Sequence, residues 1–171
     1  MAFLKMKIDL VAARTAPKEL RASLPPESTD IGPDAEIIEN VDFLGSLWRD
    51  SRGPHISGQF TTKVRLECAR CLGPAEIAIE GTFDDTFVEE KSTAPGEFEI
   101  RDGLLDESFA GDSVELTEVL REQILLELPE QVFCREDCRG LCPKCGQNRN
   151  LVDCNDSEDF DPRWAALKDL N

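Results

Sequence analysis

The sequence predicts an α+β protein with an antiparallel sheet, open or barrel-like, one packed helix and a small cysteine-rich C-terminal module. Three observations predict this class. Two alternating apolar and polar segments flank a short connector, a later segment has apolar residues one helical turn apart, and five of the seven cysteines lie between Cys134 and Cys154. We expect a sheet-and-helix domain over residues 1–130 and a cysteine-rich module with a short terminal helix over residues 131–171.

The clearest strands span residues 56–68 and 77–83, where apolar and polar side chains alternate with a period of two. Such alternation is typical of a strand with one buried face. The short connector between these strands predicts an antiparallel pair, with Cys68 and Cys71 near its tip.

Other elements follow from weaker patterns. Alternation over residues 4–10 predicts a strand, and residues 37–48 are expected to be extended. Residues 16–34 are rich in proline and glycine, so we expect a loop with one helical turn.

The helix is predicted over residues 118–128, with Thr117 as its cap and Pro129 ending it. Its apolar stripe includes Leu120, Ile124 and Leu128. Asp161 and Pro162 have the pattern of a helix start and predict the terminal helix.

The net charge of −16 is concentrated in an acidic segment, residues 72–130, with 17 acidic and 3 basic side chains. Within it, residues 89–113 are expected to form a solvated insertion. An acidic surface repels phosphate backbones and speeds encounter with basic partners. The alternative is that the acidity only maintains solubility.

Several functional classes lack support. There is no apolar run long enough for a membrane span, and the N-terminus lacks the features of a signal peptide, so we expect a cytoplasmic protein. No phosphate-binding glycine motif is present and no small-molecule substrate is evident. His55 is the only histidine and is expected on an exposed loop, which argues against a serine or cysteine nucleophile paired with histidine.

The cysteine tract predicts a metal centre, because cysteines in a reducing compartment favour metal or redox chemistry over disulfides. Cys142 and Cys145 can bind one ion from the same turn, and Cys154 can fold back to join them. Cys138 is the preferred fourth ligand and Cys134 the alternate. Four thiolates would close a structural zinc site.

Other arrangements of the cysteines remain open. Cys142 and Cys145 could share an ion with Cys68 and Cys71, or the thiols could be reduced and unligated. An iron–sulfur cluster is less favoured than zinc. Cys68 and Cys71 also have the spacing of a redox dithiol, although such a pair normally begins a helix.

Four motifs stand in a fixed order along the chain. Residues 68–74 match C-x-R-C-L-x-P, residues 116–129 match L-T-E-x-x-R-E-Q-x-x-L-x-x-P, residues 138–148 are close to C-K-G-L-C-P-x-C-G-x-N, and Asp161-Pro162-Arg163 is a D-P-R. These motifs resemble those of the YceD family of large ribosomal RNA subunit accumulation proteins. Relatives often carry C-x-C where this chain has only Cys154, and some lack the C-terminal box.

The resemblance implies a role in ribosome biogenesis. We expect a non-enzymatic factor that supports synthesis, processing or accumulation of large-subunit ribosomal RNA by binding an assembly partner. The acidic segment favours a basic ribosomal protein as that partner. The second version is contact with the ribosomal RNA precursor through the basic residues Arg135, Arg139, Lys144 and Arg149. The alternative from another class is a thiol–disulfide oxidoreductase that uses Cys68 and Cys71.

Overall fold

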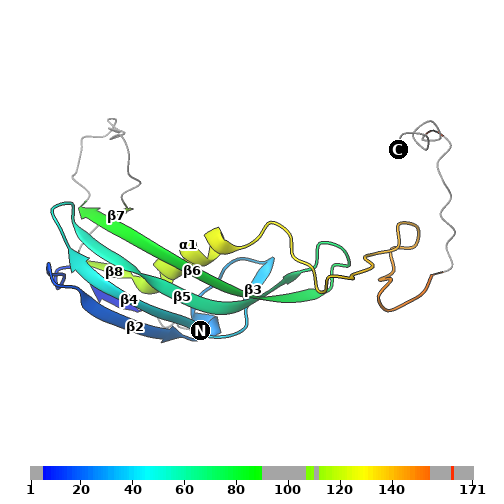
Figure 1. The fold of residues 1–171 in the computed structure, drawn as a ribbon, viewed down its shortest axis with the longest axis horizontal. Coiled ribbons are helices and arrows are strands. Elements are labelled where there is room, and N and C mark those ends of the chain that lie inside the picture. Colours follow the sequence, from blue (N-terminus) through cyan, green and yellow to red (C-terminus); the bar gives the residue numbers. More distant parts are fainter. Residues whose placement is uncertain (1–5, 90–106, 110–111, 155–162, 164–171) are drawn as a thin grey trace.

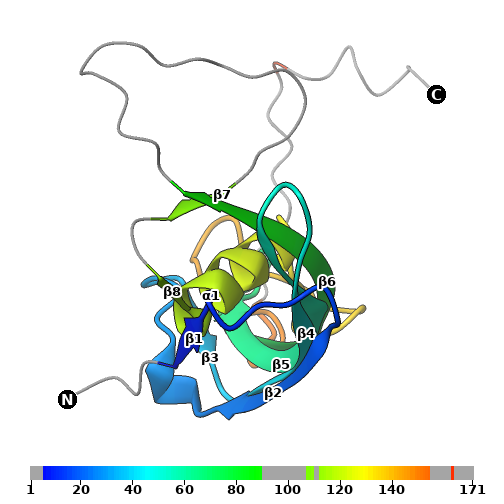
Figure 2. The ribbon, with the colours of Figure 1, turned by 90° about the vertical axis from the view of Figure 1, so that its left-hand side faces the viewer.

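The computed structural model describes residues 6–89, 107–109, 112–154 and 163. A long curved sheet follows one side of helix α1 (Leu116–Glu127), and the cysteine-rich segment projects beyond one end of that sheet (Figure 1). Seen end-on, the sheet curls around the helix, so the helix lies on the concave face (Figure 2).

The main sheet is antiparallel except at one edge. Its strands are β2 (Lys18–Leu24), β3 (Ala35–Ile37), β4 (Val41–Arg49), β5 (Pro54–Glu67), β6 (Pro74–Glu89) and β7 (Glu107–Phe109). Their order is β2-β4-β5-β6-β7, with β3 also paired to β5 and with β7 parallel to β6. A separate antiparallel pair joins β1 (Lys7–Asp9) to β8 (Ser113–Glu115). The α+β prediction is confirmed, but the barrel-like alternative is wrong because β2 and β7 do not pair to close the sheet.

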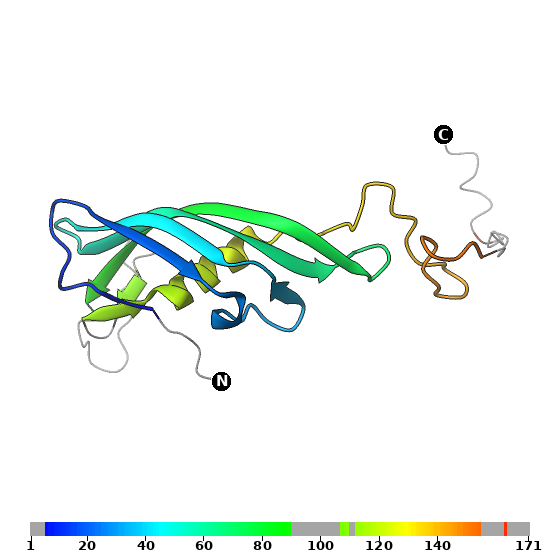
Figure 3. The same cartoon turned by 90° about the horizontal axis from the view of Figure 1, so that it is seen from below.

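The β5–β6 hairpin is the longest pair and confirms the strands predicted around the connector. Its register runs from His55 opposite Thr86 to Glu67 opposite Pro74. Figure 3 shows this hairpin arching over α1 and extending beyond it toward the cysteine-rich segment. The hairpin therefore positions its connector at the end of the sheet where that segment begins.

Two facing glycines leave room for an aromatic ring to lie against the sheet. Gly45 of β4 lies opposite Gly58 of β5. A Cβ atom at Gly58 would lie 2.6 Å from the Gly45 Cα and 2.7 Å from the Phe43 ring, which is closer than packed atoms allow. Phe43 can then stack on Phe83 of β6, with ring centroids 5.7 Å apart.

The core lies between the concave face of the sheet and α1. The helix buries Leu116, Leu120 and Ile124 completely, as its predicted period requires. They belong to one apolar cluster with sheet residues such as Phe60 and Ile79. Among the described residues, no helix is long and apolar enough to cross a membrane.

The predicted cap of this helix is wrong. The helix begins at Leu116 with Glu115 as N-cap, and no side chain caps it. The Leu116 N–H instead donates to the carbonyl of Met6 at 2.8 Å, because the N-terminal segment runs beside the helix start. Thr117 is consequently inside the helix and buried, and its hydroxyl has no hydrogen-bond partner in the described part of the chain.

Other sequence predictions have mixed outcomes. The helical turn within residues 16–34 is confirmed as η1 (Pro26–Ser28), but β2 was missed. Four of its seven residues are charged or hydroxylic, as an edge strand tolerates, so it lacks a clear alternating pattern. Most of the acidic insertion, and the start of the predicted terminal helix at Asp161 and Pro162, lie outside the described residues.

The expectation for His55 is also wrong, because its side chain is only 1% exposed. The ring stacks on Trp48 with centroids 4.0 Å apart. Its Nε2 lies 2.9 Å from Asp50 Oδ1, and its Nδ1 lies 3.0 Å from Thr86 Oγ1. A ring protonated on Nε2 satisfies both contacts, since it donates to Asp50 and accepts from Thr86.

Asp50 should make the stability of this end of the sheet depend on pH. The hydrogen bond from His55 lowers the pKa of Asp50 well below its ordinary value of 3.8; burial opposes this, and the N–H groups of Arg52 and Gly53 lower it further. The carboxylate therefore contributes its full stability above the unfolded pKa, and this contribution is lost progressively as the pH falls from that value toward the lowered pKa of the folded state. We expect urea unfolding midpoints to fall more steeply with acid below about pH 4 in the wild type than in Asp50→Asn. Parallel midpoint curves for the two proteins would contradict this, and Asp42→Asn, on the surface of β4, is the control.

The buried hydroxyl of Thr117 should reduce stability. Thr117→Val removes an unsatisfied polar group and keeps the branched shape, so we expect the free energy of unfolding to rise by about 1 kcal/mol. Urea denaturation measures the change, with the exposed Thr82→Val as control. A destabilised Thr117→Val would mean that the hydroxyl is hydrogen-bonded in solution.

Candidate metal centre

The connector between β5 and β6 is a tight turn over residues 68–73, the first cysteine turn. The Leu72 N–H donates to the Cys68 carbonyl at 2.9 Å, and the Cys68 N–H donates to the Gly73 carbonyl at 2.8 Å. Leu72 has a φ of +56°, in the left-handed region that costs a non-glycine residue about 1 kcal/mol or more. This turn places the sulfurs of Cys68 and Cys71 close together.

The segment after α1 runs to the same tip, as Figure 3 shows. The helix ends at Glu127 with Leu128 as C-cap, as the following proline predicts. The Ala69 N–H then donates to the carbonyl of Val132 at 2.8 Å. This bond anchors the segment immediately before Cys134.

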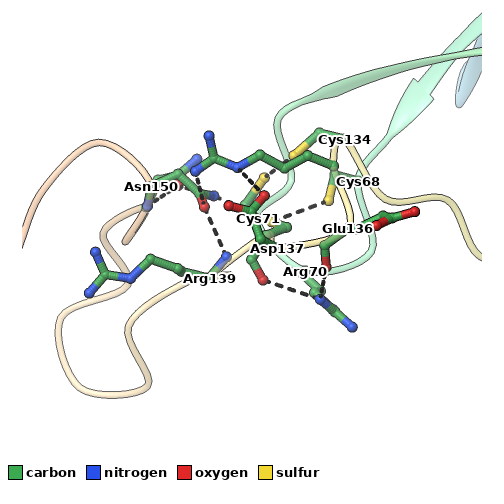
Figure 4. Close-up of polar contacts among 11 residues, drawn as sticks. Cys68, Arg70, Cys71, Cys134, Glu136, Asp137, Arg139 and Asn150 are labelled. Carbon is green, nitrogen blue, oxygen red and sulfur yellow. Dashed lines mark hydrogen bonds and ion pairs between the residues drawn. The ribbon is translucent and has the colours of Figure 1, made fainter.

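Four cysteine sulfurs converge where the two segments meet; Figure 4 shows Cys68, Cys71 and Cys134 among them. The Sγ atoms of Cys68, Cys71, Cys134 and Cys138 all lie within 4.8 Å of one another. Cys68 and Cys138 are 3.8 Å apart, and Cys71 and Cys134 are 3.7 Å apart. A tetrahedral zinc with Zn–S bonds of about 2.3 Å separates its sulfurs by about 3.8 Å, so this four-cysteine cluster fits such an ion.

The surroundings of the cluster favour thiolates at two positions. Burial raises the pKa of Cys68, but N–H groups of Cys134, Arg70 and Cys71 donate to its sulfur and bring the pKa down to about 6. At Cys138, burial is likewise outweighed, and the pKa is lowered by hydrogen bonds from the Asn150 side chain and the Gly140 N–H.

Cys134 behaves in the opposite way. Burial and hydrogen bonding with Cys138, Cys71 and Cys68 raise its pKa to about 12. Thiols this close cannot all ionise unless a cation compensates their charge. The donor set is therefore that of a thiolate metal site, in which coordination removes the remaining protons.

The cluster lies in a small apolar core of its own. Cys68, Cys71 and Cys138 are buried there with Ala75 and Val132. Cys134, the fourth ligand, is exposed, but a tetrahedron of four sulfurs has no position left for a substrate, which is the arrangement of a structural site.

Arg70 connects the first cysteine turn to the C-terminal segment. Its Nη1 donates to the carbonyls of Glu136 at 3.2 Å and Cys138 at 3.3 Å, and its guanidinium lies 4.3 Å from the centre of the Phe133 ring. The Arg70 carbonyl accepts from the Leu141 N–H at 3.0 Å. Both the backbone and the side chain of Arg70 thus bind the segment that supplies two of the sulfurs.

Asn150 is a second connection. Its Nδ2 donates to the Cys138 sulfur at 3.3 Å. Its Oδ1 accepts from the Arg139 N–H at 2.9 Å and from the Arg135 guanidinium at 2.6 Å. One amide therefore orients a cluster sulfur and holds the loop that carries it.

The predicted ligand set is divided between two clusters. Cys142, Cys145 and Cys154 lie together, with their sulfurs within 4.8 Å of one another. Cys138 lies in the four-cysteine cluster, together with Cys134, its predicted alternate. In the rival arrangement, Cys142 and Cys145 would share an ion with Cys68 and Cys71. The structure does not group these four sulfurs, because Cys142 and Cys145 lie with Cys154.

Sequence reasoning missed that Cys68 and Cys71 join Cys134 and Cys138. The spacing of each pair is visible in the sequence, but their pairing depends on where the chain goes after α1. The role of Asn150 was also missed, since nothing in the sequence distinguishes it from its neighbours Asn148 and Asn155.

Two of the four basic residues predicted for RNA contact, Arg135 and Arg139, bind within the module. Arg135 contacts Asp137 at 3.4 Å in addition to Asn150, and Arg139 contacts Asp153 at 2.7 Å. Both side chains are about half exposed, at 48% and 50%. The charged side chains of Arg135 and Arg139 therefore connect the loops that surround the cysteines.

Two similar bacterial proteins have no functional description, so their similarity does not indicate what this chain does. The chain is 30% identical over 124 residues to an uncharacterized protein of Mycobacterium tuberculosis, which covers 70% of this chain and 56% of that protein. It is 28% identical over 151 residues to the uncharacterized protein YlbN of Bacillus subtilis, covering 84% and 81%. The chain thus spans little more than half of the mycobacterial relative.

A named relative and a family model are more informative. The large ribosomal RNA subunit accumulation protein YCED homolog 1, chloroplastic, of Zea mays is 25% identical over 150 residues, covering 74% of this chain and 50% of that protein. No solved structure matches significantly. The family model described as large ribosomal RNA subunit accumulation protein YceD matches residues 56–171, which include both cysteine clusters. The chain therefore belongs to the YceD family.

Proposed function

We propose that this protein is a non-enzymatic ribosome-biogenesis factor that supports accumulation of large-subunit ribosomal RNA by binding a basic ribosomal protein. Its membership in a family described by that accumulation carries the proposal. The charge of the described surface supports the choice of a basic partner.

Asp85 of β6 lies beside acidic side chains of α1. Burial raises the pKa of Asp85, and the nearby charges of Asp84 and Glu122 raise it further. Glu118 and Glu122 are exposed on α1, and within the described residues neither pairs with a lysine or arginine. We call Asp85, Glu118 and Glu122 the acidic face; Asp84, the neighbour of Asp85 in β6, points to the other side of the sheet, beside His55. A carboxylate whose pKa is raised by neighbouring negative charges, as that of Asp85 is, gains when a cationic partner binds.

Direct binding of RNA has less support. The guanidinium groups of Arg135 and Arg139 already bind acceptors inside the module. Phosphate contacts would compete with those internal bonds. RNA binding is therefore an outcome that the test below must be able to detect.

The burial of the Cys68 sulfur supports a non-enzymatic role. Cys68 has the lowered pKa of a reactive thiol, but its side chain is 0% exposed and its sulfur faces Cys138. A thiol that exchanges disulfides must be accessible to its substrate.

We propose zinc as the metal of the four-cysteine cluster. Tetrahedral sulfur coordination suits zinc or iron, and zinc is the usual ion of closed structural sites with four cysteine ligands. Bound zinc would fix the C-terminal segment to the hairpin tip and would leave the sheet and helix core unchanged.

Removing one ligand should release the segment. Cys71→Ser is expected to lose about one zinc per chain, because three thiolates bind far less tightly than four. Residues after Val132 should then become sensitive to protease, while circular dichroism of the sheet and helix is retained. Elemental analysis and limited proteolysis measure these effects. Ala69→Ser, an exposed neighbour, is the control. Unchanged zinc in Cys71→Ser, or iron in place of zinc, would contradict the assignment.

The acidic face should determine partner capture. We expect a pull-down at low salt to recover a basic ribosomal protein, and Glu118→Gln with Glu122→Gln to weaken that complex by about 2- to 10-fold. Binding should also weaken with added salt. Both protein and RNA are identified in the recovered material, and affinity is then measured with the purified partner.

The matched control is Glu27→Gln with Glu67→Gln, which removes the same charge from exposed positions outside the acidic face. Equal weakening by both double variants would mean that only net charge matters. If the pull-down recovers RNA without a ribosomal protein, and this RNA is lost when Arg135 and Arg139 are neutralised, then the partner is RNA and the proposal of a protein partner is wrong.

A further inference from the structure

A second cysteine turn, residues 142–147, repeats the backbone of the first cysteine turn. The Gly146 N–H donates to the Cys142 carbonyl at 2.9 Å, and the Cys142 N–H donates to the Gln147 carbonyl at 2.8 Å. The equivalent bonds of the first turn measure 2.9 and 2.8 Å. The fifth residue again has a positive φ, +72° at Gly146 against +56° at its counterpart.

The sulfur of the second turn also has equivalent hydrogen bonds. The N–H groups of Cys145 and Lys144, three and two residues after Cys142, donate to its sulfur and lower its pKa, and contact with Cys154 lowers it further. In the first turn, the N–H groups two and three residues after Cys68 do the same. Successive N–H groups aimed at one sulfur form a site for a thiolate.

A third sulfur completes this second cluster. The chain reverses after Asn148, whose carbonyl accepts from the N–H groups of Leu151 at 3.0 Å and Val152 at 3.1 Å. Arg139 then binds Asp153 at 2.7 Å, which fixes the residue immediately before Cys154. The Cys154 sulfur consequently lies within 4.8 Å of both sulfurs of the second turn.

The two clusters share no cysteine, so the second can bind an ion independently of the first. No fourth cysteine, histidine or carboxylate joins the second cluster in the described part of the chain. Cys145 is exposed and Cys154 half-exposed, whereas three of the four sulfurs in the first cluster are buried. A metal here therefore has a coordination position open to a donor from outside these three residues.

We propose that Cys142, Cys145 and Cys154 bind a second Zn²⁺, distinct from the ion of the four-cysteine cluster. The matching backbone of the two turns and the convergence of three sulfurs support this site. The second ion has fewer thiolates and more contact with solvent, so it exchanges faster and is lost to chelators first. The inference is independent of which assembly partner the protein binds.

Metal stoichiometry tests the inference on the full chain, purified with a thiol reductant. Native mass spectrometry should find about two zinc ions in the wild type, about one in Cys145→Ser and about one in Cys71→Ser. Gln147→Ala, exposed in the same turn, should retain both. Zinc release to a colorimetric chelator should have a fast and a slow phase, with only the fast phase lost in Cys145→Ser.

Three results would overturn the proposal. One zinc in the wild type that is kept in Cys145→Ser would show that the second cluster binds none. Alkylation that finds a disulfide among Cys142, Cys145 and Cys154 would show that these sulfurs pair instead. Loss of both ions in Cys145→Ser would show one shared site. Circular dichroism establishes that each variant is folded, and zinc lost only from Cys71→Ser would leave the four-cysteine assignment intact.

Discussion

The convergence of four sulfurs at the tip of the β5–β6 hairpin is the contact on which the position of the C-terminal segment depends. Cys68 and Cys138 are 70 residues apart, and closing a loop of that length costs about 4 kcal/mol of chain entropy. The apolar side chains at the junction are few, chiefly Val132 and Ala75. Metal–thiolate bonds are strong enough to offset that cost, whereas so small an apolar core is not.

The small cysteine core at the hairpin tip nevertheless packs against the same residues as the main apolar core. Leu66 of β5 and Ile77 of β6 pack against both the main apolar cluster and the cysteine core. Arg70 then extends the connection from the tip to the loops of the module. The β5–β6 hairpin thus connects the part of β6 that carries Asp85 with the cysteine module.

Much of the fold could be predicted because its strands and helix bury one face each. The alternation through β5 and β6 and the stripe of Leu120 and Ile124 have only one periodic interpretation. The edge strand β2 could not be predicted in this way, and neither could the helix cap, since a backbone carbonyl from Met6 replaces a side chain. The residues around each element do not indicate which distant part of the chain will contact it.

The cysteine site shows the same limit. The C-x-x-C spacing is visible at both turns, but from the sequence only Cys142 and Cys145 were predicted as a metal-binding pair, with Cys68 and Cys71 as a rival arrangement. Which pairs meet depends on the path of residues 129–138 along the sheet, which no local pattern encodes. Sequence therefore identified Cys142, Cys145 and Cys154 as neighbours but assigned Cys138 to them. The β5–β6 register has one more consequence, since a shift by one residue would turn side chains near the tip to the opposite face. A hairpin paired in that shifted register would turn Cys68 and Cys71 away from the segment that carries Cys134 and Cys138, so the four-cysteine cluster is compatible with only one register of the two strands.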